Sequence, residues 1–281
     1  MLFNSLEFLI FLPIVFLVYW SLKRYRRLQN IFVIAASYVF YGWWDWRFLI
    51  LIIFTSLCSY ASGLSIASLD EKGKRSTAKW ISAANIIVNI AILGLFKYYN
   101  FFTASFQTFL QQFGIETDFV TIKLVLPVGI SFYTFQALSY SIDVYRRKIE
   151  ATKEITAFLA FISFFPQLVA GPIERATNLL PQFLKDRCFD YNQAVDGSRQ
   201  VLWGFFKKMV IADNCAVVVN NIFENYSEYN SLVLIFGGIL FAFQIYGDFS
   251  GYSDIAIGVS KIFSINLKRN FNVPYFSRNV A

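Results

Sequence analysis

Apolar residues recur along this chain in runs that are long enough for membrane-spanning helices. Each of the first four runs approaches or reaches the ~20 residues that a helix needs to cross the hydrocarbon core of a bilayer. These runs cover residues 6–20, 31–44, 48–67 and 80–96. Later segments of similar apolar character cover residues 124–141, 201–223 and 231–246. We therefore predict a protein that crosses the membrane several times.

The apolar pattern is interrupted between residues 155 and 181. Pro166, Gly171, Pro172 and Pro181 fall inside this run, and each proline removes a backbone donor that a regular helix needs. Irregular backbone is tolerated at membrane depth only where protein or a water-filled cavity satisfies its polar groups. We predict a re-entrant segment here that lines an internal site.

Lysine and arginine are concentrated in short clusters between the apolar runs, at residues 23–27, 72–79 and 146–153. Cytoplasmic loops of membrane proteins carry an excess of these residues, so we place the clusters in the cytoplasm and the N-terminus outside. Residues 101–122 hold Glu116 and Asp118 but no basic residue. They are expected to form an external loop or a helix on the membrane surface.

Composition strengthens the prediction of a membrane protein. Of the 281 residues, 57% are hydrophobic and only 15% are charged, against roughly 25% charged in a soluble domain. We expect an all-α, polytopic transmembrane helix bundle with re-entrant segments, forming a single membrane domain over residues 1–281. The net charge of +7 lies in loop clusters and indicates orientation rather than binding to nucleic acid. Cys58, Cys188 and Cys215 lack the spacing of a zinc or disulfide site, so no metal site is predicted.

The sequence QIYGDFSGYSDIAIG at residues 244–258 carries the most polar side chains in an apolar setting. If the preceding helix continues through it, Gln244, Asp248 and Tyr252 fall on one face because they are four residues apart. The three glycines of the segment form a neighbouring stripe that lets a second helix approach closely, at positions Gly247, Gly251 and Gly258.

Two carboxylates in this segment need a polar environment. A charge that faces lipid costs ~2.5–3.5 kcal/mol at mid-bilayer, so Asp248 and Asp254 should face a cavity, a partner helix or the interface. We expect them to border an enclosed polar chamber. The alternative is that they only hydrogen-bond to neighbouring helices or mark where the helix leaves the membrane.

Two further groups of polar residues have competing interpretations. Gln167 and Glu174 flank the break around Pro172; we favour cavity lining for Gln167, whereas for Glu174 cavity lining and a simple surface charge, as for Arg175, are equally open. For Lys207 and Lys208 we favour snorkelling to lipid headgroups over recognition of an anionic acyl donor.

Other polar and aromatic residues are interpreted as structural. Asn85 and Asn89 are spaced to hydrogen-bond across to another helix. Five aromatic residues are predicted to lie at segment ends in the membrane interface, namely Trp43, Trp44, Trp46, Tyr98 and Tyr99. Residues 270–279 are too polar to span and contain Pro274, so a loop is predicted.

Five segments follow one another in an order that is itself informative. They read LPVGISFYTFQALSYSIDVYR, FFPQLVAGPIER, FFKKMVIADN, QIYGDFSGYSDIAIG and NFNVPYFSRN. Together they resemble the membrane-bound O-acyltransferase (MBOAT) superfamily, in its bacterial branch of alginate and peptidoglycan O-acetyltransferase membrane subunits. The D-alanyl transfer proteins are a more distant likeness.

The resemblance implies a helical bundle pinched into a funnel, where a histidine activates an acceptor hydroxyl to attack a thioester-linked acyl group. It implies no bound cofactor, an acyl thioester (acetyl-CoA or an acyl carrier) as donor, and a polysaccharide such as alginate or peptidoglycan as acceptor. The substrate-binding residues on this interpretation are Gln244, Asp248, Ser250, Tyr252, Asp254, Gln167, Glu174, Tyr275, Ser277 and Arg278. The chain contains no histidine. We therefore expect the catalytic histidine to lie beyond Ala281 and this chain alone to be inactive.

The same resemblance implies a bacterial inner-membrane location, with the lipid bilayer and a periplasmic acetyltransferase protein as partners. Two other classes of protein stay open. A transporter or channel also uses broken helices with polar residues at mid-membrane, although no repeated halves are visible here. A non-catalytic membrane scaffold that docks another protein is the third interpretation.

Overall fold

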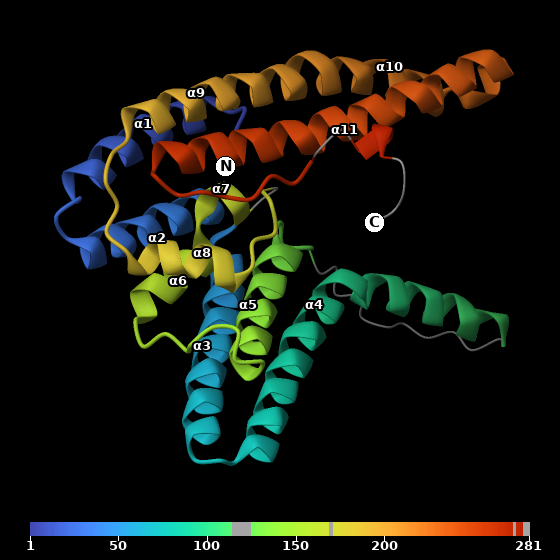
Figure 1. Cartoon of the computed structure of the whole chain (residues 1–281). Helices are drawn as coiled ribbons and strands as arrows, with labels where there is room; N and C mark the ends of the chain where they lie inside the picture. Colours follow the sequence, from blue (N-terminus) through green and yellow to red (C-terminus); the bar gives the residue numbers. More distant parts are fainter. Residues whose placement is uncertain (114–124, 169–170, 272–273, 278–281) are drawn as a thin grey trace.

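All regular secondary structure in the described residues is helical, which confirms the predicted all-α class (Figure 1). The computed structural model describes residues 1–113, 125–168, 171–271 and 274–277. The α-helices are α1 (Leu6–Ser21), α2 (Arg26–Gly42), α3 (Leu49–Glu71), α4 (Arg75–Gln112), α5 (Ile130–Tyr145), α6 (Ile155–Ser163), α7 (Phe165–Leu168), α8 (Ala176–Leu184), α9 (Tyr191–Phe205), α10 (Asp213–Glu224) and α11 (Ser231–Ile262). A π-helix, Phe206–Ala212, joins α9 to α10. Short 3-10 helices cover Trp46–Phe48, Tyr226–Glu228 and Pro274–Phe276.

Three helices in the described part of the chain are long and apolar enough to cross a membrane. They are Trp46–Glu71, Arg75–Gln112 and Ser231–Ile262, and the apolar helix α1 is shorter at 16 residues. At a rise of ~1.5 Å per residue, α11 is longer than the ~30 Å hydrocarbon core. The chain is therefore a membrane protein with several candidate spans.

Helices α3, α4 and α5 form one packed group, held together by neutral polar side chains. The Asn89 side-chain amide donates to Asn85 Oδ1 at 3.1 Å, and Ser59 Oγ of α3 donates to the same oxygen at 3.3 Å. Ser62 of α3 lies 3.2 Å from Ser141 of α5. The structural role predicted for Asn85 and Asn89 is confirmed, since they bond across the α3–α4 interface.

Helix α4 is much longer than the predicted segment that ended at residue 96. It continues through Phe101 to Gln112, and Figure 1 shows its second half bending away from the packed group. Tyr98 and Tyr99 therefore lie within a helix, and their predicted position at a segment end is wrong. Residues 101–112 are helical, one of the two predicted alternatives, and their place on the membrane surface stays a prediction; Glu116 and Asp118 lie outside the described residues.

The interrupted segment forms short helices and no regular membrane-length helix, as its prolines and glycine predicted, whereas its re-entrant position stays a prediction. Helices α6, α7 and α8 have nine, four and nine residues, and the aromatic side chains of α6 and α7 are buried in the core. Pro166 and Pro172 lie at or beside the breaks. The prediction for Pro181 is wrong, because α8 continues through it and ends three residues later at Leu184. Proline lacks a backbone N–H, so α8 loses one hydrogen bond at Pro181, and the helix ends within one turn after it.

A second packed group consists of α11 running antiparallel to α9, the π-helix and α10 (Figure 1). Glycines bring the backbones together: a Cβ added to Gly204 would lie 2.7 Å from the Gly251 carbonyl oxygen. A Cβ on Gly258 would lie 2.5 Å from the carbonyl oxygen of Gly197. The predicted glycine stripe on α11 is confirmed, and α9 supplies matching glycines.

Ion pairs join the three basic clusters to one another. Arg147 pairs with Asp70 at 2.6 Å, beside the cluster at residues 72–79, and Arg26 pairs with Glu154 at 2.6 Å. The end of α1 then meets the end of α11, where the Tyr19 hydroxyl donates to the Phe263 carbonyl at 2.9 Å. These contacts agree with clusters that share one side of the membrane, and which side that is stays a prediction.

Candidate functional site

The π-helix turns two consecutive lysines toward α11. Side chains of neighbouring residues in an α-helix diverge by ~100°, whereas the wider π-turn reduces that divergence. Lys207 and Lys208 both reach carboxylates of α11, while Gly251 between those carboxylates permits the close approach. Single π-turns inside helices are frequent at functional sites.

The first ion pair joins Lys207 to Asp254. The ammonium lies 2.5 Å from Asp254 Oδ2 and also donates to Ser250 Oγ at 2.9 Å. Gln200 of α9 donates to the other carboxylate oxygen at 2.8 Å. Both charged side chains are only about 15% exposed, at 14% for Lys207 and 15% for Asp254. The carboxylate is thus neutralised and hydrogen-bonded on both oxygens.

The second ion pair lies six residues, or about 1.7 helical turns, nearer the start of α11. Lys208 is 2.6 Å from Asp248 Oδ1 and 2.8 Å from Asp213 Oδ1, and its ammonium lies 5.3 Å from the centre of the Tyr252 ring. Asp248 keeps 47% of its side chain exposed. The described residues therefore do not enclose Asp248, and the enclosed chamber predicted around it stays a prediction.

Four of the predicted site residues thus contact the two lysines in two groups: Ser250 and Asp254 lie at Lys207, and Asp248 and Tyr252 lie at Lys208. The helix α11 continues through these positions, which was the condition for the predicted shared face of Asp248 and Tyr252. Gln244 lies one turn before Asp248, half-buried, and its Oε1 has no hydrogen-bond partner among the described residues.

Other predicted site residues lie away from the ion pairs. Gln167 is buried and donates to the Phe161 carbonyl at 2.7 Å. Glu174 is also buried, so its interpretation as a surface charge is wrong; it accepts from Asn178 at 2.8 Å and from the backbone N–H of Lys268. Glu174 therefore anchors the segment that follows α11 to the broken helices.

The loop after α11 returns toward the α11 helix. Tyr275 donates to the Ala242 carbonyl at 2.8 Å, and its ring lies 5.7 Å from that of Tyr246, two residues before Asp248. Ser277 is exposed, and Arg278 lies outside the described residues.

The favoured interpretation of Lys207 and Lys208 is wrong. Their ammonium groups pair with carboxylates inside the protein instead of extending toward lipid headgroups. Sequence reasoning also missed Gln200, which donates to Asp254, and Asp213, which pairs with Lys208. The signal was present, since two lysines within an apolar helical stretch require counter-charges nearby.

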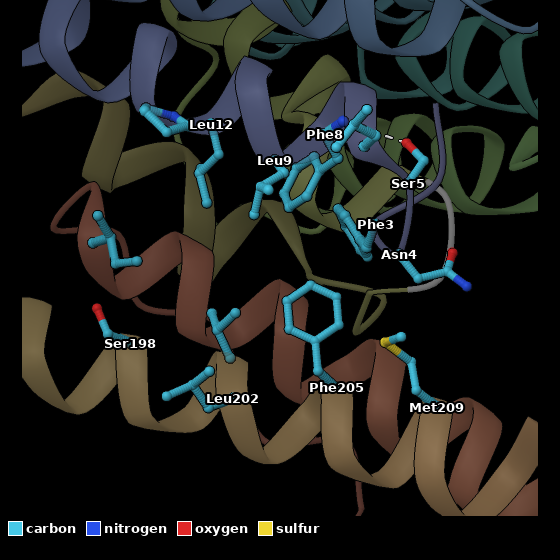
Figure 2. A pocket seen from close by; sticks show the side chains of 14 residues that line it. Phe3, Asn4, Ser5, Phe8, Leu9, Leu12, Ser198, Leu202, Phe205 and Met209 are labelled. Atoms are coloured by element: carbon cyan, nitrogen blue, oxygen red, sulfur yellow. Dashed lines mark hydrogen bonds between the residues drawn. The ribbon is translucent and has the colours of Figure 1, made fainter.

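Two cavities flank the site. An apolar pocket of about 630 Å³ lies between α1 and α9, where Phe8 and Leu9 face Phe205 and Met209 (Figure 2). A smaller open pocket of about 400 Å³ lies beside the first ion pair and is lined by Lys207, Asp254 and further charged residues. Only the second pocket has the polarity to hold a charged ligand.

These features define a class: a polytopic helical membrane protein with charges paired across a close contact between two glycine-bearing helices. No family model matches the chain. The chain is 38% identical over 283 residues to "Probable alginate O-acetylase AlgI" of Azotobacter vinelandii, an alignment that covers 100% of this chain and 55% of the relative. It is 32% identical over 311 residues to the "Peptidoglycan O-acetyltransferase" of Helicobacter pylori, covering 100% of the chain and 57% of the relative.

A more distant likeness covers part of the chain. The "Teichoic acid D-alanyltransferase" of Bacillus subtilis is 28% identical over 167 residues, which are 56% of this chain and 40% of the relative. The chain is thus a membrane homologue of bacterial alginate and peptidoglycan O-acetyltransferases, as the resemblance of its motifs indicated. The chain spans little more than half the length of the Azotobacter vinelandii and Helicobacter pylori relatives.

Proposed function

We propose that this chain forms the core of a membrane-bound O-acyltransferase. It moves an acetyl or similar acyl group from a cytoplasmic thioester, acetyl-CoA or an acyl carrier, to a hydroxyl of an extracytoplasmic polysaccharide such as alginate or peptidoglycan. The protein works in a bacterial inner membrane with its N-terminus outside, together with a periplasmic acetyltransferase protein. Support comes from identity along the whole chain to proteins named for O-acetyl transfer.

The structural observation that carries the proposal is the pair of lysine–aspartate contacts along α11. Charges inside an apolar helix contact are costly and mark functional positions in membrane proteins. Asp248 is paired with Lys208 yet remains 47% exposed, so one side of the carboxylate is open to a substrate. In the proposed reaction this carboxylate and the Tyr252 hydroxyl orient the polar groups of the substrates.

These 281 residues do not contain the general base of the reaction. A histidine is the side chain best suited to move a proton near neutral pH, and none is present. We therefore assign binding and positioning, not proton transfer, to the polar residues on α11. By itself the chain is expected to transfer no acetyl group.

The test is acetyl transfer in proteoliposomes by the protein joined to the part of an alginate O-acetylase relative that lies outside the alignment. Labelled acetyl-CoA is the donor and alginate or peptidoglycan fragments are acceptors. Asp248→Asn should lower transfer by ~100-fold, because a displacement of ~1 Å in a bound substrate has that effect. Protein yield should not change.

The matched control is Asp45→Asn. Asp45 also forms an ion pair, with Arg47 at 2.7 Å, but it lies in the exposed link between α2 and α3. Full transfer by the Asp248→Asn protein would remove the proposed role of this carboxylate. Solute flux through the same liposomes, without acetyl transfer, would favour the transporter interpretation.

A further inference from the structure

The pocket of about 400 Å³ beside the first ion pair has more positive than negative side chains in its lining. Its lining includes three cations, Lys207, Lys261 and Arg269, and one carboxylate, Asp254. Asp254 is already neutralised by Lys207 and hydrogen-bonded by Gln200. Lys261 and Arg269 are therefore the pocket cations that have no partner among the residues lining the pocket.

The two remaining cations are held loosely or not at all. Lys261 pairs with Asp196 at 2.6 Å, but the Asp196 side chain is 65% exposed, and an exposed pair of this kind contributes little free energy. Lys261 nevertheless lowers the pKa of the Asp196 carboxyl through its hydrogen bond. Arg269 is exposed and has no hydrogen-bond or ion-pair partner within the described residues. Both side chains can therefore turn to an anion in the pocket.

A flat aromatic surface lies next to these charges. Trp203 lines the pocket, is 54% exposed and stacks on Phe206 with ring centres 5.3 Å apart. The Lys207 ammonium lies 5.6 Å from the Trp203 ring centre. An exposed indole that lines the same pocket as a guanidinium suits a ligand with both a phosphate group and a flat base, since Arg binds phosphate in a bidentate manner and aromatic rings stack on bases.

The position of the pocket favours a donor over an acceptor. Lys261 is the penultimate residue of α11, and the adjoining Ile262 carbonyl accepts from the Trp20 indole at 3.3 Å, just before the first basic cluster. That end of the molecule is the one that the excess of basic residues places in the cytoplasm. From Lys261 to Asp248 is 13 residues, or about 20 Å along the helix axis at ~1.5 Å per residue. A long flexible donor anchored at Lys261 can thus extend its thioester toward Asp248.

We propose that Lys261, Arg269 and Trp203 form a binding site for the phosphate groups of the acyl donor, of the kind carried by coenzyme A. The inference rests on the proposed function, because it names the donor and where its phosphates bind. Lys207 and Asp254 form the neutral inner wall of this pocket.

The experiment measures binding and needs no transfer. The probe is coenzyme A, titrated against the protein in nanodiscs of phosphatidylcholine, with 3′-dephospho-coenzyme A and inorganic phosphate as comparison ligands. Arg269→Gln and Lys261→Gln should each weaken coenzyme A binding by about tenfold, as expected for one lost charge-assisted contact. The control is Arg47→Gln, which also removes one positive charge but in the α2–α3 link.

Three outcomes would overturn the inference. Equal affinity of the Arg269→Gln, Lys261→Gln and unaltered proteins would show that coenzyme A binds elsewhere. Loss of coenzyme A binding when the phosphatidylcholine of the nanodiscs is replaced by phosphatidylglycerol would assign the pocket to a lipid headgroup. Displacement by alginate oligosaccharides alone would assign it to the acceptor. Normal coenzyme A binding, together with no acetyl transfer by the fused protein in proteoliposomes, would instead contradict the proposed function and leave the site intact.

Discussion

The α3–α4 contact and the α9–α11 contact solve the same problem with different chemistry. Between α3 and α4 the buried polar groups are neutral, with Asn85, Asn89 and Ser59 sharing hydrogen bonds. Between α9 and α11 the backbones approach through glycines, and charged side chains face one another beside them. Both helix pairs include a candidate membrane span.

The difference separates a structural contact from a candidate site. Neutral hydrogen bonds between helices satisfy polar groups at small cost and add a fraction of a kcal/mol each. Ion pairs carry a desolvation penalty, and neutral residues could hold two helices together without it. The charges on α11, and especially the half-exposed Asp248, are therefore the part of the molecule where a function is expected.

The largest effect should come from removing the close approach of α9 and α11. Gly204→Leu places side-chain atoms against the backbone of Gly251 and Ile255, which cannot move aside as a side chain can. We expect destabilisation beyond the ~1–3 kcal/mol typical of an overpacked site, seen as loss of folded protein in detergent. Gly238→Leu on the same α11 is the control, because no atom lies within 4 Å of its added Cβ. Equal loss in both proteins would show that packing of α9 on α11 is not the cause.

The next effect should distinguish the two ion pairs. Lys207→Met leaves Asp254, 15% exposed, without its charge partner and should cost ~3 kcal/mol of stability. Lys208→Met leaves Asp248, 47% exposed, and should cost ~1 kcal/mol or less because water screens the carboxylate. Unfolding of each variant in detergent provides the comparison. A second change, Asp254→Leu, should recover most of the stability lost in Lys207→Met, and no recovery would mean that Lys207 acts through other contacts.

The smallest effect is expected at the neutral contact. Asn89→Leu removes the hydrogen bonds to Asn85 and Ser59 and should cost ~0.6 kcal/mol, the average for such bonds in a membrane protein. Coenzyme A binding should be unchanged. A loss of binding as large as that in Arg269→Gln would contradict the division between a structural α3–α4 contact and a functional α9–α11 contact.

Several features were determined by local properties of the sequence. Runs of apolar residues predicted the helices, because apolar side chains are favourable both in the protein core and in contact with lipid, whichever helices pack together. The four-residue spacing from Asp248 to Tyr252 predicted their shared face once α11 was continuous. The glycines of α11 predicted a close helix contact, since no other residue permits it.

Only the tertiary structure decided which polar residues meet. Gln200 and Lys207 lie 54 and 47 residues from Asp254 along the chain, so no local pattern connects them. The π-helix packs against α11, which brings both of its lysines to carboxylates of that helix. For the same reason Glu174 became an anchor for the Lys268 backbone rather than a surface charge. Periodicity describes one helix at a time, whereas the partner of a charge depends on which helices pack together.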